Sequence, residues 1–250
     1  MKVKNNTVLI TGGATGIGFA LAETLVRAGN TVVVCGRRQN KLEEAKRKLP
    51  QIYIRTCDVS KEEERKALFN WVKDNFKDFN VLVNNAGIQR MVDLKKGARD
   101  LMIGENEIEI NLVAPIYLSA HFIPLLMKQK EAAIVNVSSG LGFVPIASMP
   151  VYCATKAAIH SFTISLRHQL KNTSVNVFEV VPPAVDTELG KGSVEEEDEW
   201  NRGIQPAEVA KAIMNSLGKD EYEIVIGEAK GLVTGSRNNP DEAFKNLNQW

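Results

Sequence analysis

Short apolar runs alternate along the chain with longer stretches in which apolar residues recur at helical spacing. Runs such as Val32-Val33-Val34 are apolar at every position, as are strands covered on both faces of a sheet. The pattern predicts strands at Thr7–Thr11, Thr31–Cys35, Ile52–Thr56, Val81–Val83, Ala132–Val137, Val175–Val181 and Glu223–Ile226. It predicts helices between them at Gly16–Ala28, Lys41–Leu49, Glu62–Asn75, Glu105–Lys128, Val151–Leu170 and Ala207–Leu217.

This alternation of strand and helix predicts βαβ units and an α/β fold with a parallel sheet. No stretch rich in glycine, serine and proline divides the chain, so a single domain over residues 1–250 is the better prediction. Three segments lack clear periodicity and are expected to be irregular: Ile88–Gly104, Asp186–Gln205 and Gly227–Trp250. Within the last of these, Asn239–Trp250 has the spacing of a short amphipathic tail helix.

Composition narrows the classes of function. The 250 residues include 31 Lys and Arg against 30 Asp and Glu, a formal net charge of +1. Proteins that coat nucleic acid or an anionic membrane usually carry a basic excess, so a nucleic-acid binder is not expected. The most apolar segment, Leu112–Met127, is shorter than the ~20 residues of a membrane span and contains Pro115 and Pro124. It predicts a buried or interface helix and no membrane span.

The cysteines and the N-terminus bear on the compartment. Cys35, Cys57 and Cys153 are odd in number and widely spaced, which argues against a disulfide framework and against a zinc site. The segment Met1–Thr7 leads into the first strand without the apolar stretch of a signal peptide. A cytoplasmic protein with reduced thiols and no bound metal is therefore expected.

A glycine-rich loop, Thr11–Gly18, follows the first predicted strand and opens a helix. Glycines suit this place because a pyrophosphate must approach the backbone closely, and the helix N-terminus then offers free N–H groups to the anion. The spacing is TGxxxGxG and differs from the general GxGxxG fingerprint. Strand-to-helix turns use glycine in any case, so the position after the first strand is what favours a dinucleotide site.

The second predicted strand ends in Cys35-Gly36-Arg37-Arg38 and lacks the acidic residue that holds the ribose 2′-hydroxyl of NAD. A guanidinium at this turn suits the 2′-phosphate of NADP through charge-assisted hydrogen bonds. Arg37 and Arg38 could also simply solubilise a turn. Beside the glycine loop, the pair favours NADP(H) over NAD(H).

Three polar signals follow later strands or open a helix: Asn84-Asn85-Ala86-Gly87, Ser138-Ser139-Gly140 and Tyr152–Lys156. Ligands of open α/β sheets bind beyond the carboxyl ends of the strands, so these segments are expected to converge. Tyr152 and Lys156 are four residues apart and share one helix face. A nearby ammonium lowers the pKa of a phenol, which can then exchange a proton with a carbonyl or alcohol oxygen. Taken alone, such a pair is more often an exposed lysine near a packed tyrosine.

Together these motifs resemble the classical short-chain dehydrogenases/reductases, and the resemblance extends from about Thr7 to Ile226. A closer similarity is to bacterial oxidoreductases named for the lipoteichoic-acid D-alanylation gene cluster. The family implies a Rossmann fold, a doubly wound seven-stranded parallel sheet with helices on both faces. It implies hydride transfer between NAD(P)(H) and a small carbonyl or alcohol substrate. It also implies a homodimer or homotetramer, formed through the two long helices.

The resemblance assigns roles residue by residue. Tyr152 would be the acid/base, Lys156 would lower its pKa and bind the nicotinamide ribose, and Ser139 would orient the substrate oxygen. Asn111 would distort its helix and hold a water that links Lys156 to solvent. The expected cofactor-binding residues are Gly12, Thr15, Gly16, Ile17, Gly18, Arg37, Arg38, Asp58, Val59, Asn85, Ala86, Gly87, Tyr152, Lys156, Val185 and Thr187.

Two positions depart from the family pattern, and one segment remains open. Pro182-Pro183 replaces the usual Pro-Gly, so this turn cannot copy a glycine conformation. Thr15 stands where some NADP-preferring members carry a basic residue. Residues 186–205 would form a lid over the substrate, and residues 227–250 a C-terminal tail. The acidic run Glu195–Glu199 in the lid is more typical of a solvated face than of a site for a cationic substrate.

Two other functions are compatible with parts of the sequence. A redox sensor would bind NADP(H) without turnover and act through a partner, but it would not need the set of Asn111, Ser139, Tyr152 and Lys156. An epimerase or dehydratase of the extended relatives would show a different glycine spacing and a longer C-terminal region. The leading hypothesis is an NADP-preferring oxidoreductase that acts on CH–OH or C=O groups.

Overall fold

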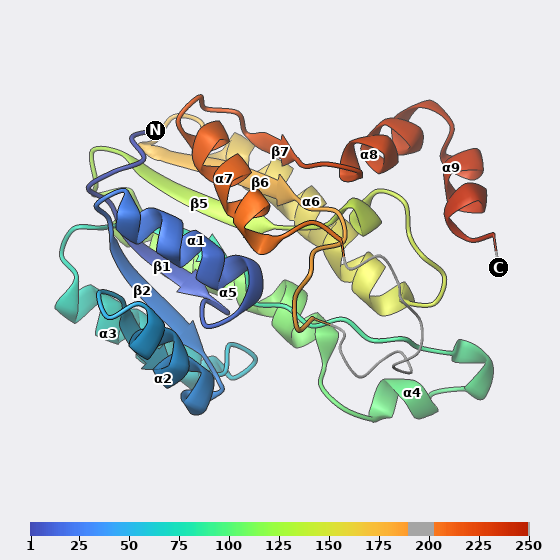
Figure 1. The fold of residues 1–250 in the computed structure, drawn as a ribbon, viewed down its shortest axis with the longest axis horizontal. Coiled ribbons are helices and arrows are strands. Elements are labelled where there is room, and N and C mark those ends of the chain that lie inside the picture. Colours follow the sequence, from blue (N-terminus) through green and yellow to red (C-terminus); the bar gives the residue numbers. More distant parts are fainter. Residues whose placement is uncertain (190–202, 250) are drawn as a thin grey trace.

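A seven-stranded parallel sheet runs through the molecule in the order β3-β2-β1-β4-β5-β6-β7 (Figure 1). The computed structural model describes residues 1–189 and 203–249. The strands are β1 (Thr7–Thr11), β2 (Thr31–Gly36), β3 (Tyr53–Thr56), β4 (Phe79–Asn84), β5 (Ala132–Val137), β6 (Val175–Val181) and β7 (Glu223–Val225). All neighbouring strands pair in parallel, which confirms the predicted sheet.

Helices cover both faces of the sheet. One face carries α1 (Gly16–Arg27), α2 (Gln39–Lys48) and α7 (Pro206–Leu217), and the other carries α3 (Glu62–Asn75), α5 (Ala114–Leu126) and α6 (Pro150–Leu170). Side chains of a strand point alternately to the two faces, so Val8 and Ile10 join the first core and Leu9 the second. This double coverage explains why the strands are apolar throughout.

From β1 the chain adds β2 and β3 on one side of the sheet, and it then returns to add β4 to β7 on the other side of β1. Chain segments that leave the carboxyl ends of β1 and β4 therefore diverge to opposite sides, and in open α/β sheets ligands bind at this point. The loops that carry the predicted motifs after β1, β4, β5 and β6 all leave the same edge of the sheet.

The predicted helix Glu105–Lys128 is shorter and less regular than expected. Asn106 Oδ1 accepts the backbone N–H groups of Ile108 and Glu109 at 3.0 and 3.3 Å, which caps the helix start after Glu105. A π-helical turn then occupies Glu109–Val113, before α5. The stretch Glu109–Leu126 is the one described helix long and apolar enough to cross a membrane, and it packs against α3 and the sheet.

The C-terminal segment is more ordered than the sequence predicts. The segment 227–250 was expected to be irregular except for a short helix within Asn239–Trp250. The structure has two helices here, α8 (Ala229–Asn238) and α9 (Pro240–Leu247). Between them, Asn239 caps α9, its Oδ1 accepting the N–H of Glu242 at 3.3 Å. The sequence analysis missed α8 because only two of its residues, Ala229 and Val233, are buried, so its apolar stripe is short.

The segment Ile88–Gly104 is largely irregular, as predicted, and contains two short helical turns, Leu94–Lys96 and α4 (Arg99–Met102). The other predicted helix and strand limits agree with the structure to within one or two residues. Most of the lid at 186–205, with its acidic run Glu195–Glu199, lies outside the described residues, as does Trp250.

Candidate active site

The glycine loop between β1 and α1 has a backbone that side chains would obstruct. Gly12 and Gly16 have φ values of +64° and +55°, in the left-handed region that glycine adopts without strain. A Cβ atom on Gly18 would lie 2.5 Å from the carbonyl oxygen of Gly12. Thr15, which precedes α1, makes no side-chain cap to the helix, so the first N–H groups of α1, beginning with those of Gly16 and Ile17, remain available to an anion.

The turn after β4 is hydrogen-bonded to this loop. The Thr11 hydroxyl accepts the backbone N–H groups of Asn85 and Ala86, both at 3.0 Å. The Asn85 amide nitrogen donates to the carbonyl oxygens of Thr11 and Gly12 at 2.9 and 3.2 Å. The motifs after β1 and β4 are far apart in sequence but are held together by these hydrogen bonds.

The two arginines after β2 each face a carboxylate. Arg37 forms an ion pair with Glu105, and Arg38 Nη1 lies 3.0 Å from Glu188 Oε2. Lys41 joins the second pair, with its Nζ 3.3 Å from Glu188 Oε1. All these side chains are at least partly exposed. The sequence analysis missed both glutamates, since nothing in the local pattern after β2 points to Glu105 or Glu188, which lie far away along the chain.

The segment after β3 lies beside Arg37. The Asp58 carboxylate accepts hydrogen bonds from the backbone N–H and hydroxyl of Ser60 at 3.0 and 2.7 Å. Burial acts to raise the pKa of Asp58, but the Ser60 hydrogen bonds and the charges of Lys61 and Arg37 lower it overall. The next residue, Val59, is buried and packs into the core.

Tyr152 in the first turn of α6 meets Ser139, which follows β5. Tyr152 is buried, and the Ser139 hydroxyl lies close enough to its phenol to lower the pKa of Tyr152. Burial raises the pKa of Tyr152 to about 12, against the lowering effect of Ser139 and with a smaller raising effect from the charge of Glu107. The phenol is therefore protonated at neutral pH in the protein without a cofactor.

Lys156 lies one helical turn beyond Tyr152. Its Nζ donates to the carbonyl oxygen of Val137 at 2.9 Å and lies 5.6 Å from the centroid of the Tyr152 ring. Burial lowers the pKa of Lys156 to about 8. The sequence analysis expected the ammonium to lower the pKa of the phenol. In this structure the net direction is opposite, because removing the phenolate from water outweighs the lowering effect of Ser139.

Asn111 lies within the π-helical turn, where the predicted helix distortion is present. Its side chain accepts the N–H of Ile88 at 2.9 Å and donates to the carbonyl of Ile88 at 2.8 Å and to Thr155 Oγ1 at 3.2 Å. Asn111 thus links the segment after Gly87 to α6. A Cβ atom on Gly87 would lie 3.3 Å from Asn111 Oδ1 and 3.7 Å from Lys156 Nζ, which places all three side by side.

The first residues of the segment 186–205 lie beside the glycine loop. Val185 forms a β-bridge with Ile204, and Asp186 N donates to the Ile204 carbonyl at 2.9 Å, so the described residues at the two ends of this segment lie together. The methyl carbon of Thr187 lies 3.0 Å from where a Cβ atom on Gly16 would be. The Pro182-Pro183 turn is held by its first carbonyl, which accepts the N–H of Gly140 at 3.1 Å.

A buried glutamate beside Tyr152 was not predicted. The Glu107 side chain is fully buried, its Oε1 accepts the Arg90 backbone N–H at 3.0 Å, and its Oε2 lies 3.6 Å from Arg90 Nε. Burial raises the pKa of Glu107, and the contacts with Arg90 oppose this shift. The four-residue spacing to Asn111 was the signal available in the sequence, because it puts both side chains on one helix face.

Residues 6–198 match the family model described as short chain dehydrogenase. The chain belongs to the short-chain dehydrogenase family. This short-chain dehydrogenase is 49% identical to the uncharacterized oxidoreductase DltE of Bacillus subtilis, over 99% of this chain and 98% of that protein. The resemblance seen in the motifs, including the closer bacterial group, is confirmed.

Two solved structures share the fold over almost the whole chain. A short chain dehydrogenase from Burkholderia cenocepacia, in complex with NADP, has a TM-score of 0.82 and 25% identity, with 99% of each chain covered. A short chain dehydrogenase/reductase from Burkholderia phymatum, in complex with NAD, has a TM-score of 0.84 and 21% identity, with 97% of this chain and 95% of that chain covered. The Rossmann fold is thereby confirmed, and the family supports NAD(P)-dependent oxidoreduction.

Proposed function

We propose that this short-chain dehydrogenase is an NADP-preferring reductase of small carbonyl compounds that also catalyses the reverse alcohol oxidation. The observation that carries the proposal is the grouping of the Ser139 hydroxyl and the buried Tyr152 phenol, with the Lys156 ammonium 5.6 Å from the Tyr152 ring, at the sheet edge where the glycine loop lies. Two hydroxyl groups so placed can hold one substrate oxygen, and one of them is a titratable phenol.

The described residues fit a dinucleotide. Gly12, Gly16 and Gly18 form a backbone cradle that Cβ atoms would fill, at the open N-terminus of α1. Arg37 and Arg38 follow β2, where the adenosine ribose of a dinucleotide is placed in this kind of fold, and both are positively charged. Asn85 and Ala86 border this loop at Gly12, and Thr187 borders it at Gly16. When bound, NADPH would supply the hydride.

In the proposed reduction, the Ser139 and Tyr152 hydroxyl groups hold the carbonyl oxygen of the substrate. Tyr152 gives its phenolic proton to that oxygen as hydride arrives at the carbon, so the product is the alcohol. A phenol whose pKa is raised to about 12 is fully protonated at neutral pH and suits the role of acid.

Lys156 and Asn111 act behind the tyrosine. The Lys156 ammonium, held at the Val137 carbonyl, stabilises the phenolate that remains after proton transfer. With a pKa of about 8, Lys156 can also pass on a proton near neutral pH. Asn111 fixes the distance between the segment at Ile88 and α6, and so keeps Lys156 beside Gly87. A water bound near Asn111 would complete the path to solvent.

The direct test is the loss of NADPH absorbance with the purified protein over a broad panel of aldehydes and ketones, with an NADH arm. We expect turnover of part of the panel, faster with NADPH. Binding of NADPH, shown by fluorescence in the same samples, without turnover of any compound in either direction would contradict the proposal and favour a redox sensor.

Arg37 is expected to determine the cofactor preference. Replacing Arg37 by glutamine should weaken NADP⁺ binding about 10- to 100-fold, since a hydrogen bond to a charged group contributes roughly 1.5–3 kcal/mol. NAD⁺ lacks the 2′-phosphate, so its Kd should change less than about threefold. Isothermal titration with both cofactors measures the two values.

Glu105→Gln is the matched variant for the same ion pair. It removes the carboxylate that faces Arg37 and leaves the arginine in place, so NADP⁺ binding should be equal to that of wild type or tighter. An equal loss of NAD⁺ and NADP⁺ affinity in Arg37→Gln would show that Arg37 does not contact the 2′-phosphate.

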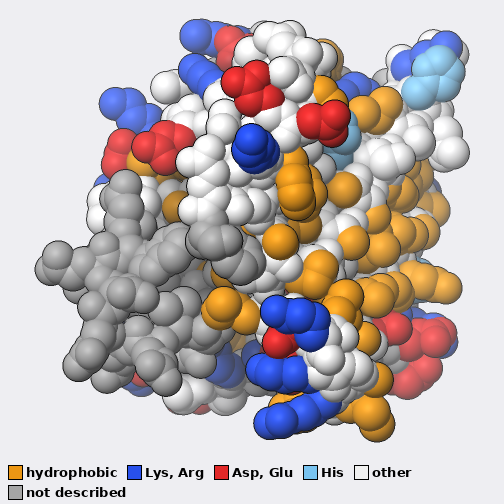
Figure 2. All heavy atoms as spheres, turned by 90° about the vertical axis from the view of Figure 1, so that its right-hand side faces the viewer, with side chains coloured by type: hydrophobic (Ala, Val, Ile, Leu, Met, Phe, Trp, Pro, Cys, Tyr) orange, Lys and Arg blue, Asp and Glu red, His pale blue; other side chains and the backbone are white. Residues whose placement is uncertain are grey.

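The surface supports assembly with a second copy of the chain. Figure 2 shows apolar side chains gathered over a continuous part of one face. Among the exposed apolar residues, Tyr117 and Met127 in or next to α5 and Ile164 in α6 are each about half exposed. A homodimer through these helices would bury them, and a homotetramer needs one further contact.

A further inference from the structure

A buried carboxylate lies in the middle of β6. Glu179 is 1% exposed, although its neighbours in the strand sequence, Phe178 and Val180, are fully buried apolar residues. A carboxylate removed from water costs several kcal/mol unless hydrogen bonds and an opposite charge compensate it. The partners of Glu179 therefore show what this residue does.

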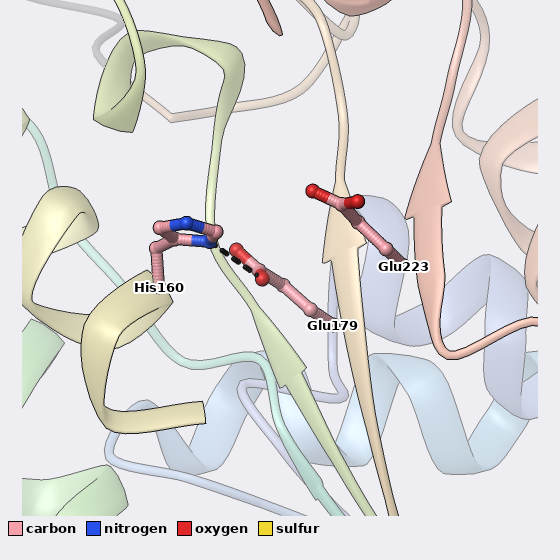
Figure 3. A group of neighbouring side chains, drawn as sticks. All are labelled: His160, Glu179 and Glu223. Atoms are coloured by element: carbon pink, nitrogen blue, oxygen red, sulfur yellow. Dashed lines mark hydrogen bonds and ion pairs between the residues drawn. The ribbon is translucent and has the colours of Figure 1, made fainter. Parts of the chain in front are cut away.

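Both carboxylate oxygens of Glu179 have a partner. Oε1 accepts the Ser138 hydroxyl at 2.6 Å, and Oε2 lies 2.8 Å from His160 Nδ1 (Figure 3). The hydrogen bond with Glu179 raises the pKa of His160 despite partial burial, and the charges that face the ring are Glu179 on β6, Glu223 on β7 and Arg237 on α8. A neutral imidazole can also keep its proton on Nδ1, so this contact persists on both sides of the titration.

The two partners belong to the segments that carry the proposed catalytic groups. Ser138 immediately precedes Ser139, whose extended backbone (φ −167°, ψ 155°) turns adjacent side chains to opposite sides. Ser138 thus points to Glu179, while the Ser139 hydroxyl lies on the side of Tyr152, whose pKa it lowers. His160 lies on α6 one turn beyond Lys156. Glu179 therefore binds to both segments from β6.

Packing leaves this turn few alternatives. A Cβ atom on Gly140 would lie 2.8 Å from a Leu232 methyl carbon of α8, and one on Gly142 would lie 2.9 Å from the Lys156 backbone of α6. The His160 ring also packs on Phe143, with 4.4 Å between ring centroids. The turn is therefore held between α6 and α8 by contact, and Glu179 fixes it from the side of the sheet.

A metal ion does not explain this cluster. The ligand atoms of His160, Glu179 and Glu223 lie within 4.8 Å of one another, as they would around a cation. However, both Glu179 oxygens already accept hydrogen bonds, and Glu223 is paired with Arg237 at 2.8 and 3.2 Å. Among the three side chains drawn in Figure 3, the one interaction joins His160 and Glu179.

We propose that Glu179 and His160 are positioning residues for the proposed reaction: through Ser138 they set the place of the Ser139 hydroxyl relative to Tyr152. The expected loss of kcat rests on the proposed function. The expected placement of the Ser139 hydroxyl rests only on the hydrogen bonds of Glu179. Misplacement of a reacting group by about 1 Å can cost 10²-fold in rate.

The test uses a double variant that is built to fold. Glu179→Leu with His160→Phe replaces the buried ion pair by apolar groups, a change that is often neutral or stabilising. We expect its thermal unfolding to resemble that of wild type and its Kd for NADP⁺ to stay within about twofold. We expect kcat for carbonyl reduction to fall about 10- to 100-fold. The single variant Glu179→Gln can still accept the Ser138 hydroxyl and donate to a neutral His160. It should therefore keep most of the wild-type kcat.

Glu223→Gln is the matched control, because Glu223 belongs to the same cluster but does not reach the serine turn. It should leave kcat unchanged. Wild-type kcat in the folded double variant would overturn the proposal. If wild type turns over no carbonyl compound, the proposed function fails, and crystal structures of wild type and the double variant decide the inference. The Ser139 hydroxyl should be displaced from the Tyr152 phenol in the double variant relative to wild type, and an unchanged distance between the two hydroxyl oxygens there would overturn the inference.

Discussion

Replacing Tyr152 by phenylalanine is expected to lower kcat for carbonyl reduction by about 10²- to 10⁴-fold, the range that general acid–base catalysis contributes. The change removes only the phenolic hydroxyl, so the proton donor is lost while the ring still packs in its buried place in α6. Ser139 remains but cannot replace Tyr152, because an aliphatic hydroxyl is a far weaker acid. The ratio kcat/KM should fall in parallel.

The measurement is NADPH oxidation by wild type and Tyr152→Phe with the best substrate of the panel. Fluorescence titration with NADPH gives the control, and its Kd should change by no more than about threefold. Cys153→Ala, a change at the adjacent residue of the same helix turn, should keep wild-type kcat. Near-wild-type turnover in Tyr152→Phe would exclude the proposed mechanism while leaving family membership untouched.

Replacing Gly18 by alanine is expected to weaken binding of NADP⁺ and NAD⁺ alike. The new Cβ would lie 2.5 Å from the Gly12 carbonyl oxygen, 2.6 Å from Asn85 Nδ2 and 2.9 Å from Gly13 Cα. Two of these neighbours are backbone, so the loop must open to admit the methyl group. Overpacking of this kind costs about 1–3 kcal/mol, which corresponds to roughly 5- to 150-fold in Kd if the strain falls on the bound form.

Isothermal titration with both cofactors, together with thermal unfolding, tests this prediction. Gly231→Ala in α8 is the matched control, because a Cβ atom on Gly231 would meet no atom within 4 Å and alanine favours a helix. That variant should bind both cofactors as wild type does and unfold at the same or a slightly higher temperature. Unchanged affinity and stability in Gly18→Ala would mean that the loop has room that its geometry does not indicate.

The glycine loop and the Tyr152–Lys156 pair could be predicted because their meaning is local. A TGxxxGxG run after a strand, or two side chains four residues apart on a helix, has much the same geometry wherever it occurs. The same reasoning failed for α8, whose apolar stripe is too short to show a period. It also placed the start of the Glu105–Lys128 helix two residues too early, because Asn106 caps the backbone there.

The partners of the charged residues could not be predicted. Arg37 meets Glu105, and Glu179 meets His160 and Ser138, across sequence separations that no local pattern spans. A glutamate in the middle of the apolar run Val175–Val181 was the one visible sign that a buried charge needs a partner. The position of this glutamate in the strand shows that it needs a partner, but it does not show which side chain that partner is.

The sequence by itself determined the order of strands and helices, the parallel sheet and the residue types at its active edge, since these follow from periodicity and from the chemistry of each side chain. Only the tertiary structure decided how those residues are charged. Burial raises the pKa of Tyr152 to about 12 and lowers that of Lys156 to about 8. Both shifts come from the loss of water around the side chains, which happens only when β5, α6 and the segment at Ile88 close over them.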